Sequence, residues 1–244
     1  MAFKSPNPSS KSIVTLIPWD PASAEHVQRL VLQRIACGWN YEGVEGWRTI
    51  QETGEFNLQW VVLDDSDPDR DTKVLKHTQA FPEEEEPLID SAVSFGGKSR
   101  SISSPKRSFT PVGHICLGRV PVEYEAAGYA KNENGVYWIS NFYISKALQR
   151  SGLGKAAMDS IEKFAVSEPL YAKTLALNTV DDRGDPEREE KYKAHGMEIP
   201  PVSNQEWYER RNYQVYTHAE KLFSTVDLTG KTCHWNAVFL RKNI

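Results

Sequence analysis

The stretch ISNFYISKALQRSGLGKAAMDSIEKFA, residues 139–165, decides the fold. It begins in a strand-like segment that ends at Ile144, and from Gly152 onward apolar residues recur at three- and four-residue steps, as on one helix face. Gly152 and Gly154 let several backbone N–H groups point into one concavity, and the helix adds the positive end of its dipole. With Arg150 and Lys155 beside it, this turn predicts a phosphate-binding site.

Two common nucleotide motifs fit the turn poorly. In a Walker A loop, Gln149 would occupy the place of the first glycine and Ala156 the place of the Ser or Thr that holds magnesium. A Rossmann GxGxxG/A is formally matched by Gly152, Gly154 and Ala157. That motif follows its strand almost directly, however, whereas seven residues (145–151) intervene here. Both readings are disfavoured by the spacing.

A third reading, Gln-x-x-Gly-x-Gly at Gln149, Gly152 and Gly154, resembles the GCN5-related N-acetyltransferase (GNAT) superfamily. A second segment, WYERRNY at 207–213, is similar to the family's Tyr-Glu-x-x-Gly-Phe/Tyr. Asn212 stands in the glycine place, and Asn is the usual substitute where a helix ends in a left-handed conformation. The resemblance covers about residues 12–63 and 111–244.

The resemblance implies an α/β fold of the GNAT acyl-CoA N-acyltransferase type. Its mixed central sheet would have about seven strands, with the fourth and fifth splayed apart and helices on the flanks. The residue patterns agree with that order. They predict strands at 12–20, 56–64, 112–120, 135–144, 174–180, 213–222 and 231–243, and helices at 21–36, 44–53, 152–166 and 206–212. The first helix should begin with Asp20 as N-cap and Pro21 at its first position.

The predicted organisation is a disordered N-terminus at 1–11 and a single GNAT domain at 12–244. Charge and turn residues replace hydrophobic periodicity at about 64–110, which predicts a Ser-rich, solvated insertion without regular structure. A second insertion is expected at about 180–205. Within it, DDRGDPE (181–187) only loosely resembles a calcium loop, because the Gly and Glu positions of an EF-hand are lacking, so a solvated charge run is expected.

Composition bounds the partners and the compartment. The 29 basic and 33 acidic residues give a net charge of −4, so nothing global steers the chain to nucleic acid or to an anionic membrane. The three cysteines form no CxxC pair, which disfavours a disulfide framework and a zinc site. No segment has the length of a membrane span. We expect a protein of the cytoplasm or nucleus, without metal, as a monomer or homodimer.

The family's functional residues carry over onto two segments. Acetyl-CoA would bind through the backbone of the fourth strand, through the glycine turn and through an amide after the fifth strand. These residues are Phe142, Ile144, Gln149, Arg150, Ser151, Gly152, Leu153, Gly154, Lys155 and Asn178. Because the insertion lengthens the spacing after Asn178, Asn204 is a competitor for its place. Tyr208 would face the sulfur of coenzyme A and protonate the departing thiolate, whose basicity is similar to that of a phenol with a pKa of about 10.

The general base and the acceptor stay open. GVYWISNFYI, the predicted fourth strand, contains no carboxylate, so Glu42, Glu45 and His114 are the candidates. The acceptor pocket would be aromatic and mildly acidic, which suits a small amine or an amino acid derivative. Its predicted residues are Trp39, Tyr41, Glu42 and Glu45, with Trp47, Phe223 and Trp235 nearby, although Trp39 and Trp47 would equally suit packing on the core.

The predicted function is that of an acetyl-CoA-dependent N-acetyltransferase in which a primary amine attacks the thioester directly. Two alternatives remain: a non-catalytic acyl-CoA-binding regulatory module, which the missing strand carboxylate allows, and a protein or peptide N-acetyltransferase.

Overall fold

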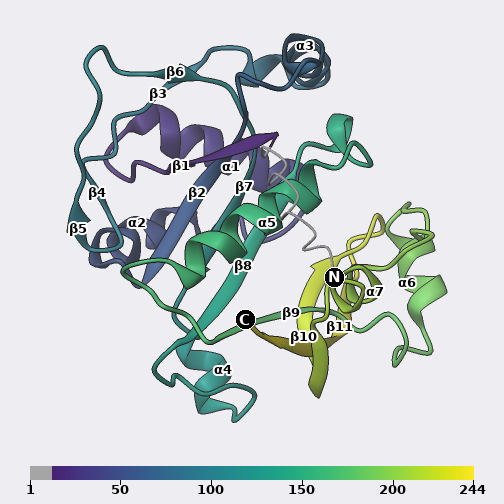
Figure 1. The fold of residues 1–244 in the computed structure, drawn as a ribbon. Helices are drawn as coiled ribbons and strands as arrows, with labels where there is room; N and C mark the ends of the chain where they lie inside the picture. The colour runs from purple at the N-terminus through teal and green to yellow at the C-terminus, as the bar shows by residue number, and fades with distance from the viewer. Residues whose placement is uncertain (1–12) are drawn as a thin grey trace, which may run out of the picture. The chain divides into compact units, whose positions relative to one another are not determined.

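A seven-stranded mixed sheet is the centre of the fold. The computed structural model describes residues 13–244, so the N-terminus predicted to be disordered lies outside the described residues. The strand order is β1-β2-β7-β8-β9-β11-β10, which confirms the predicted α/β class (Figure 1). In chain order the strands are β1 (Val14–Pro18), β2 (Phe56–Leu63), β7 (Pro111–Gly118), β8 (Val136–Ile144), β9 (Thr174–Val180), β10 (Gln214–Val226) and β11 (Thr232–Asn243).

The sheet contains both antiparallel and parallel strand pairs. β1 with β2, β10 with β11 and β11 with β9 are antiparallel. β8 and β9 are parallel and pair at their starts, from Val136–Trp138 to Thr174–Ala176. A parallel pair needs a crossover, and α5 supplies it.

Helices and short elements fill the connections. The helices are α1 (Ala24–Cys37), α2 (Val44–Thr53), α3 (Arg70–Ala80), α4 (Val122–Ala126), α5 (Leu153–Val166), α6 (Arg188–Ala194) and α7 (Asn204–Glu209), with single 3₁₀ turns η1 (Pro82–Glu84) and η2 (Lys146–Leu148). Two small antiparallel pairs are β3 (Leu88–Ile89) with β6 (Ser108–Phe109), and β4 (Ser94–Phe95) with β5 (Lys98–Ser99).

The start of α1 differs from the prediction. Ser23, not Asp20, is the N-cap, and its hydroxyl accepts from His26 N at 3.3 Å. Asp20 Oδ1 instead accepts from Ala22 N at 2.9 Å, which closes a turn one step before the helix. Asp and Ser are both common N-cap residues, so the residue types do not decide between Asp20 and Ser23, and the prediction of Asp20 is wrong.

Two compact units divide the described chain. Residues 13–116 and 141–163 form unit 1, and residues 117–140 and 164–244 form unit 2. The core of unit 1 joins β1, β2 and α1 through Trp19, Leu30, Leu58 and Trp60, all at most 1% exposed. The core of unit 2 gathers its buried residues around Phe239; they are Val120, Trp138, Ala176, Ala219 and Ala237. Each core is large enough to fix its own strands.

The first insertion is ordered, which corrects the prediction of an unpatterned solvated segment at 64–110. It contains α3, η1 and the β3–β6 pair, and Leu88 and Phe109 are buried against the core of unit 1. Figure 1 shows this segment passing outside the helices α1 and α2. Its buried anchors are spaced too irregularly for either the helix or the strand period, so periodicity did not reveal them.

The prediction that the charged segment at 181–187 is solvated is also wrong. Asp181, Asp182 and Asp185 are buried, not solvated. Each carboxylate has a cationic or imidazole partner: His218 at 2.9 Å for Asp181, Arg188 at 3.1 Å for Asp182, and Lys191 at 2.6 Å for Asp185. Among the described residues, no cluster of His, Cys, Asp and Glu has the arrangement of a metal site.

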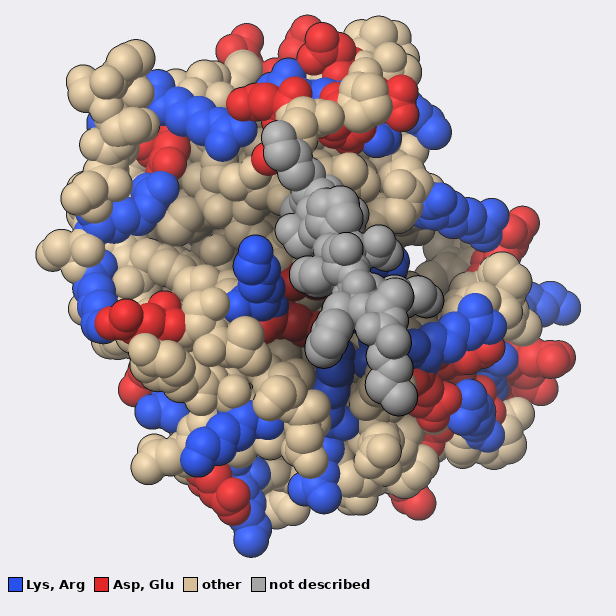
Figure 2. Space-filling model, in the orientation of Figure 1, with Lys and Arg blue, Asp and Glu red and all other residues tan. Residues whose placement is uncertain are grey.

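The surface carries both charges. Lys and Arg side chains are interspersed with Asp and Glu on the face drawn in Figure 2, in keeping with a net charge of −4. Within residues 13–244, the helices are all too short or too polar to cross a membrane.

Candidate functional site

The predicted phosphate-binding turn is built on Ser145, where β8 ends. Ser145 N donates to Val112 O of β7 at 2.8 Å, and Ser145 O accepts from Leu148 N at 2.8 Å, which closes η2. Ser151 Oγ then donates back to Leu148 O at 2.5 Å. Gln149 Nε2 reaches back as well, to Ile144 O at 3.4 Å. The side chains of the turn therefore serve its own backbone and hold it as a compact bend.

Two residues of this bend have left-handed backbone conformations. Arg150 has φ 65° and Gly152 has φ 85°. A residue such as Arg rarely adopts positive φ, so Arg150 is a local outlier of the kind that clusters at ligand sites. A Cβ added to Gly152 would meet nothing within 4 Å, so there is room beside the main chain. The first turn of α5, a helix of 14 residues, presents N–H groups that have no intrahelical partner. These features suit a diphosphate.

The two predicted cations of the turn differ. Lys155 Nζ lies 2.9 Å from Asp159 Oδ2, one helical turn further along α5, and both side chains are well exposed. Such an exposed pair contributes little, so an incoming phosphate would compete with it easily. Arg150 is exposed, and its guanidinium would add a second positive charge beside the bend.

The strand that leads into the bend is tightly packed on β7. A Cβ on Gly113 would overlap the carbonyl oxygen of Tyr143, so only glycine permits this approach. Asn141 has φ 47°, which interrupts the extended backbone of β8 just before the predicted coenzyme-binding residues. Phe142 is half-buried and Ile144 is buried. Their backbone role stays a prediction.

The predicted acceptor residues lie together after α1, in unit 1. Tyr41, Glu42 and Glu45 are exposed, and Trp39 is half-buried with its carbonyl held by Arg34 Nε at 2.8 Å. Glu45 Oε1 is paired with Arg48 at 2.7 Å. The Tyr41 hydroxyl bonds to Glu42, and this raises the pKa of Tyr41. The segment is accessible, as an acceptor site requires.

Trp47 belongs to the core. It packs on the unit 1 core, with its ring 5.3 Å from the Phe56 ring and 5.8 Å from the Arg34 guanidinium. The alternative of simple packing therefore describes Trp47. Trp235 in unit 2 is likewise buried, with its indole N–H donating to Thr225 Oγ1 at 2.7 Å.

Tyr208, the predicted acid, lies on α7 in unit 2. The helix is capped by Ser203 Oγ, which accepts from Glu206 N at 3.1 Å. The helix ends at Glu209. In the turn that follows, Asn212 has φ 68° and Tyr213 N donates to Tyr208 O at 3.1 Å. The left-handed conformation predicted for Asn212 is thus confirmed. The Tyr208 ring lies 5.0 Å from Trp207 and 5.8 Å from Tyr213.

Burial raises the pKa of Tyr208, and the nearby Arg211 charge only partly opposes this. The phenol keeps its proton at neutral pH, but in the free protein it is a weaker acid than the pKa of about 10 that the match with a departing thiolate assumes.

Asn178, the predicted amide, lies in the middle of β9 opposite Phe239. Its side chain therefore points to the core of unit 2, on the same side as Tyr124. No hydrogen bond of ordinary geometry satisfies the buried Asn178 Nδ2, but the Tyr124 hydroxyl lies within hydrogen-bonding reach of the Asn178 side chain. The amide therefore already has a polar neighbour, and its contact with a ligand stays a prediction. The competitor Asn204 is exposed at the first position of α7.

The base candidates separate by burial. His114 is completely buried, its Nδ1 lies 2.9 Å from Gln33 Oε1, and Arg34 Nη1 lies 3.4 Å from its Nε2. Burial, with the Arg34 charge, holds the pKa of His114 well below the ordinary value. Because it is completely buried, His114 cannot take a proton directly from a substrate amine. Glu42 and Glu45 remain candidates for the general base.

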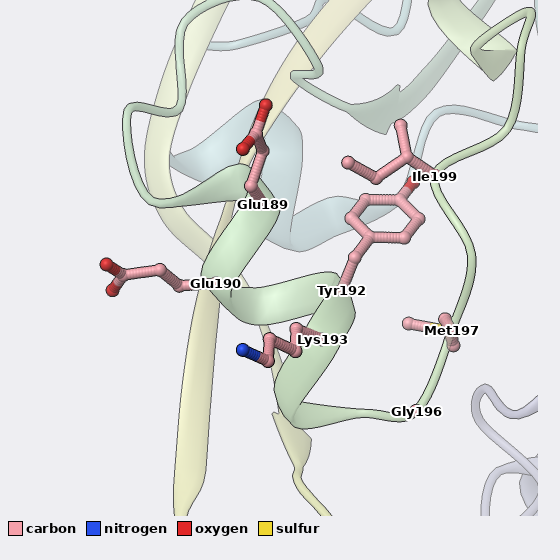
Figure 3. Close-up of a pocket in the computed structure, with 7 residues that line it drawn as sticks. All are labelled: Glu189, Glu190, Tyr192, Lys193, Gly196, Met197 and Ile199. Carbon is pink, nitrogen blue, oxygen red and sulfur yellow. The ribbon is translucent and has the colours of Figure 1, made fainter.

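A hollow of about 550 Å³ lies in unit 2, around α6. Figure 3 shows Tyr192 and Ile199 pointing toward one another across it, while Glu190 points away. None of the predicted site residues lines it.

The mixed sheet and the turn before α5 are those expected of an α/β acetyltransferase fold, and comparison with known proteins gives the family. The acetyltransferase (GNAT) family matches residues 67–196, more than half of the chain. The chain belongs to this family. No curated protein matches it in sequence.

Solved structures share the fold at low identity. NAA60 of Arabidopsis thaliana in complex with a bisubstrate analogue is 10% identical, with a TM-score of 0.51 over 95% of this chain and 99% of that chain. The same protein in complex with acetyl-CoA gives 11% identity, a TM-score of 0.50 and coverage of 95% and 98%. An aminoglycoside 6'-N-acetyltransferase complexed with coenzyme A is 11% identical, with a TM-score of 0.50 over 95% of this chain and 96% of that chain.

Proposed function

We propose that this protein is an acetyl-CoA-dependent N-acetyltransferase that passes the acetyl group to a primary amine by direct attack on the thioester. The observation that carries the proposal is the bend at 149–155, with left-handed Arg150 and Gly152 at the start of α5. Family membership and the acetyl-CoA and coenzyme A complexes of the structural neighbours support it.

The proposed roles follow from the chemistry of each group. The bend residues hold the diphosphate, the β8 backbone at Phe142 and Ile144 pairs with the pantetheine amides, and Asn178 Nδ2 supplies one further donor. Tyr208 gives its proton to the leaving thiolate. The amine loses its proton to Glu42, Glu45 or water. The exposed aromatic and acidic segment at 39–45 favours a small amine or amino acid derivative as acceptor.

Thermal unfolding with and without coenzyme tests the cleft first. Acetyl-CoA at a hundredfold over its Kd should stabilise the fold by about 2.7 kcal/mol. For a chain of this size that is a rise of roughly 5–10 °C in Tm. No rise with any acyl-CoA would refute coenzyme binding altogether.

Release of free thiol across a panel of amines then separates an enzyme from a binder. Turnover with small amines supports the proposal. Turnover only with peptides would assign the protein and peptide alternative, and binding without turnover would assign the regulatory one.

A further inference from the structure

A buried polar chain in unit 1 connects the insertion to the phosphate-binding bend. His77 on α3 has its Nδ1 2.9 Å from Ser145 Oγ, the residue on which the bend is built. His77 Nε2 lies 3.4 Å from Glu84 Oε2 of η1. His77 and Ser145 are 0% exposed and Glu84 is 1% exposed. Polar groups buried this deeply are costly unless they are mutually satisfied, so the chain fixes the positions of its members.

The chain continues to α1 and β7. Gln33 Nε2 donates to Glu84 Oε2 at 2.7 Å and to Pro111 O at 3.1 Å, and Gln33 Oε1 faces His114 Nδ1 at 2.9 Å. Arg29 Nε lies 3.9 Å from the same Glu84 carboxylate, and Arg29 Nη2 donates to Glu86 O at 2.6 Å. The Glu84 carboxylate is therefore positioned by Gln33 and Arg29 of α1, independently of its contact with His77.

His77 Nε2 makes no hydrogen bond with the described residues, and the Glu84 carboxylate is its near neighbour at 3.4 Å. The hydrogen bond of 2.9 Å between His77 Nδ1 and Ser145 Oγ exists in either tautomer of His77, and the position of the proton decides only which atom donates. This fixes the rotamer of Ser145, whose backbone already bonds to Val112 on β7 and to Leu148 in η2.

Ser, His and Glu in contact also make up the residue set of a hydrolase triad. The burial of all three excludes that use, because no substrate reaches a serine that has no exposed surface. The arrangement suits support of a neighbouring site.

We infer that α3 of the insertion is part of the coenzyme site, with His77 as a positioning residue that holds Ser145 and, through η2, the phosphate-binding bend. The inference rests on the proposed function. The internal hydrogen bonds of the bend lead back to Ile144, Ser145 and Leu148, so a shift of Ser145 moves the whole bend away from the geometry that a diphosphate needs.

Titration of coenzyme A by calorimetry, with acetyl-CoA kinetics, tests this in the full chain. His77→Leu removes the imidazole from the His77–Ser145 hydrogen bond, and Ser145→Ala removes the hydroxyl group from it. Each should raise the coenzyme A Kd about threefold to tenfold, the usual range for one net hydrogen bond, and raise KM for acetyl-CoA with kcat nearly unchanged. His77→Asn places an amide near the Nδ1 position and should restore most of the affinity.

His26→Leu is the matched control. His26 is an equally buried unit 1 histidine, bonded to Trp60 Nε1 and Asp20 N at 3.1 Å and to Ile89 O at 3.0 Å. It should lower Tm comparably without changing the coenzyme A Kd. If His77→Leu does not fold, the coenzyme A Kd of Ser145→Ala tests the inference instead.

Wild-type Kd in the folded variants, or equal weakening in His26→Leu, would overturn the inference alone. A wild-type chain that binds no coenzyme A would overturn the proposed function, and the inference with it.

Discussion

At the scale of single residues, Tyr208 is the group on which the proposed chemistry depends most. Its ring contacts Trp207 and Tyr213, so Tyr208→Phe keeps the packing and removes only the hydroxyl group that would donate the proton. We expect kcat to fall about a hundredfold while the acetyl-CoA Kd stays within about twofold, because the proton is needed only as the thiolate leaves. Steady-state thiol release and calorimetry measure the two quantities.

Tyr216→Phe is the control for that substitution. Tyr216 is another phenol of unit 2 whose pKa is raised by burial, and no predicted role falls on it. Its removal should leave kcat near the wild-type value. An unchanged kcat in Tyr208→Phe would reject Tyr208 as the acid.

At the scale of elements, the bend before α5 depends on Gly152. With φ 85°, Gly152 occupies a conformation that costs an L-residue about 1–2 kcal/mol, yet its Cβ would meet no protein atom. Gly152→Ala should therefore fold with a slightly lower Tm. Its methyl group would fill the space proposed for the diphosphate, so the coenzyme A Kd should rise at least tenfold.

Gly128→Ala provides the comparison, since Gly128 also has positive φ, 74°, with nothing within 4 Å of an added Cβ. It should show the same small loss of Tm at wild-type affinity. Equal Kd values in both alanine variants would show that the bend does not hold the diphosphate.

The elements also show what sequence reasoning reaches. The short apolar run at 174–180 and the glycine-flanked segment at 44–53 predict β9 and α2 with the observed bounds. Motif chemistry predicts the left-handed Asn212 correctly. These successes rest on interactions that are local in the chain.

Non-local pairing explains the failures. α3 hardly shows in a local pattern, since its anchoring contact, His77 with Ser145, joins residues 68 positions apart. Asp181 looks solvated in sequence because its partner, His218, lies 37 positions away. The buried polar chain from Gln33 to Ser145 is not predictable from local patterns for the same reason, because its hydrogen bonds join residues that are distant in the sequence.

At the scale of the whole molecule, buried histidines should set the pH dependence of stability near neutrality. Burial lowers the pKa of His114 well below the ordinary histidine value of 6.5, and burial also lowers the pKa of His26. Below pH 6.5 the unfolded chain binds protons that the folded chain refuses, so stability is present above this pH and is lost as the pH falls. Carboxylates act in a separate window: hydrogen bonds from Ser66 help lower the pKa of Asp64 from 3.8 to about 2, so its contribution disappears only as the pH drops through that range.

We therefore expect Tm to fall steadily between pH 7.5 and pH 5, well before the carboxylates titrate. His114→Gln, which keeps an amide among Gln33 and Arg34 but cannot titrate, should start from a lower Tm and lose less of it over the same range. Scanning calorimetry at half-unit pH steps measures both slopes. Parallel slopes for the wild type and His114→Gln would show that this histidine accepts a proton in the folded state, and that the polar chain it terminates is open to water.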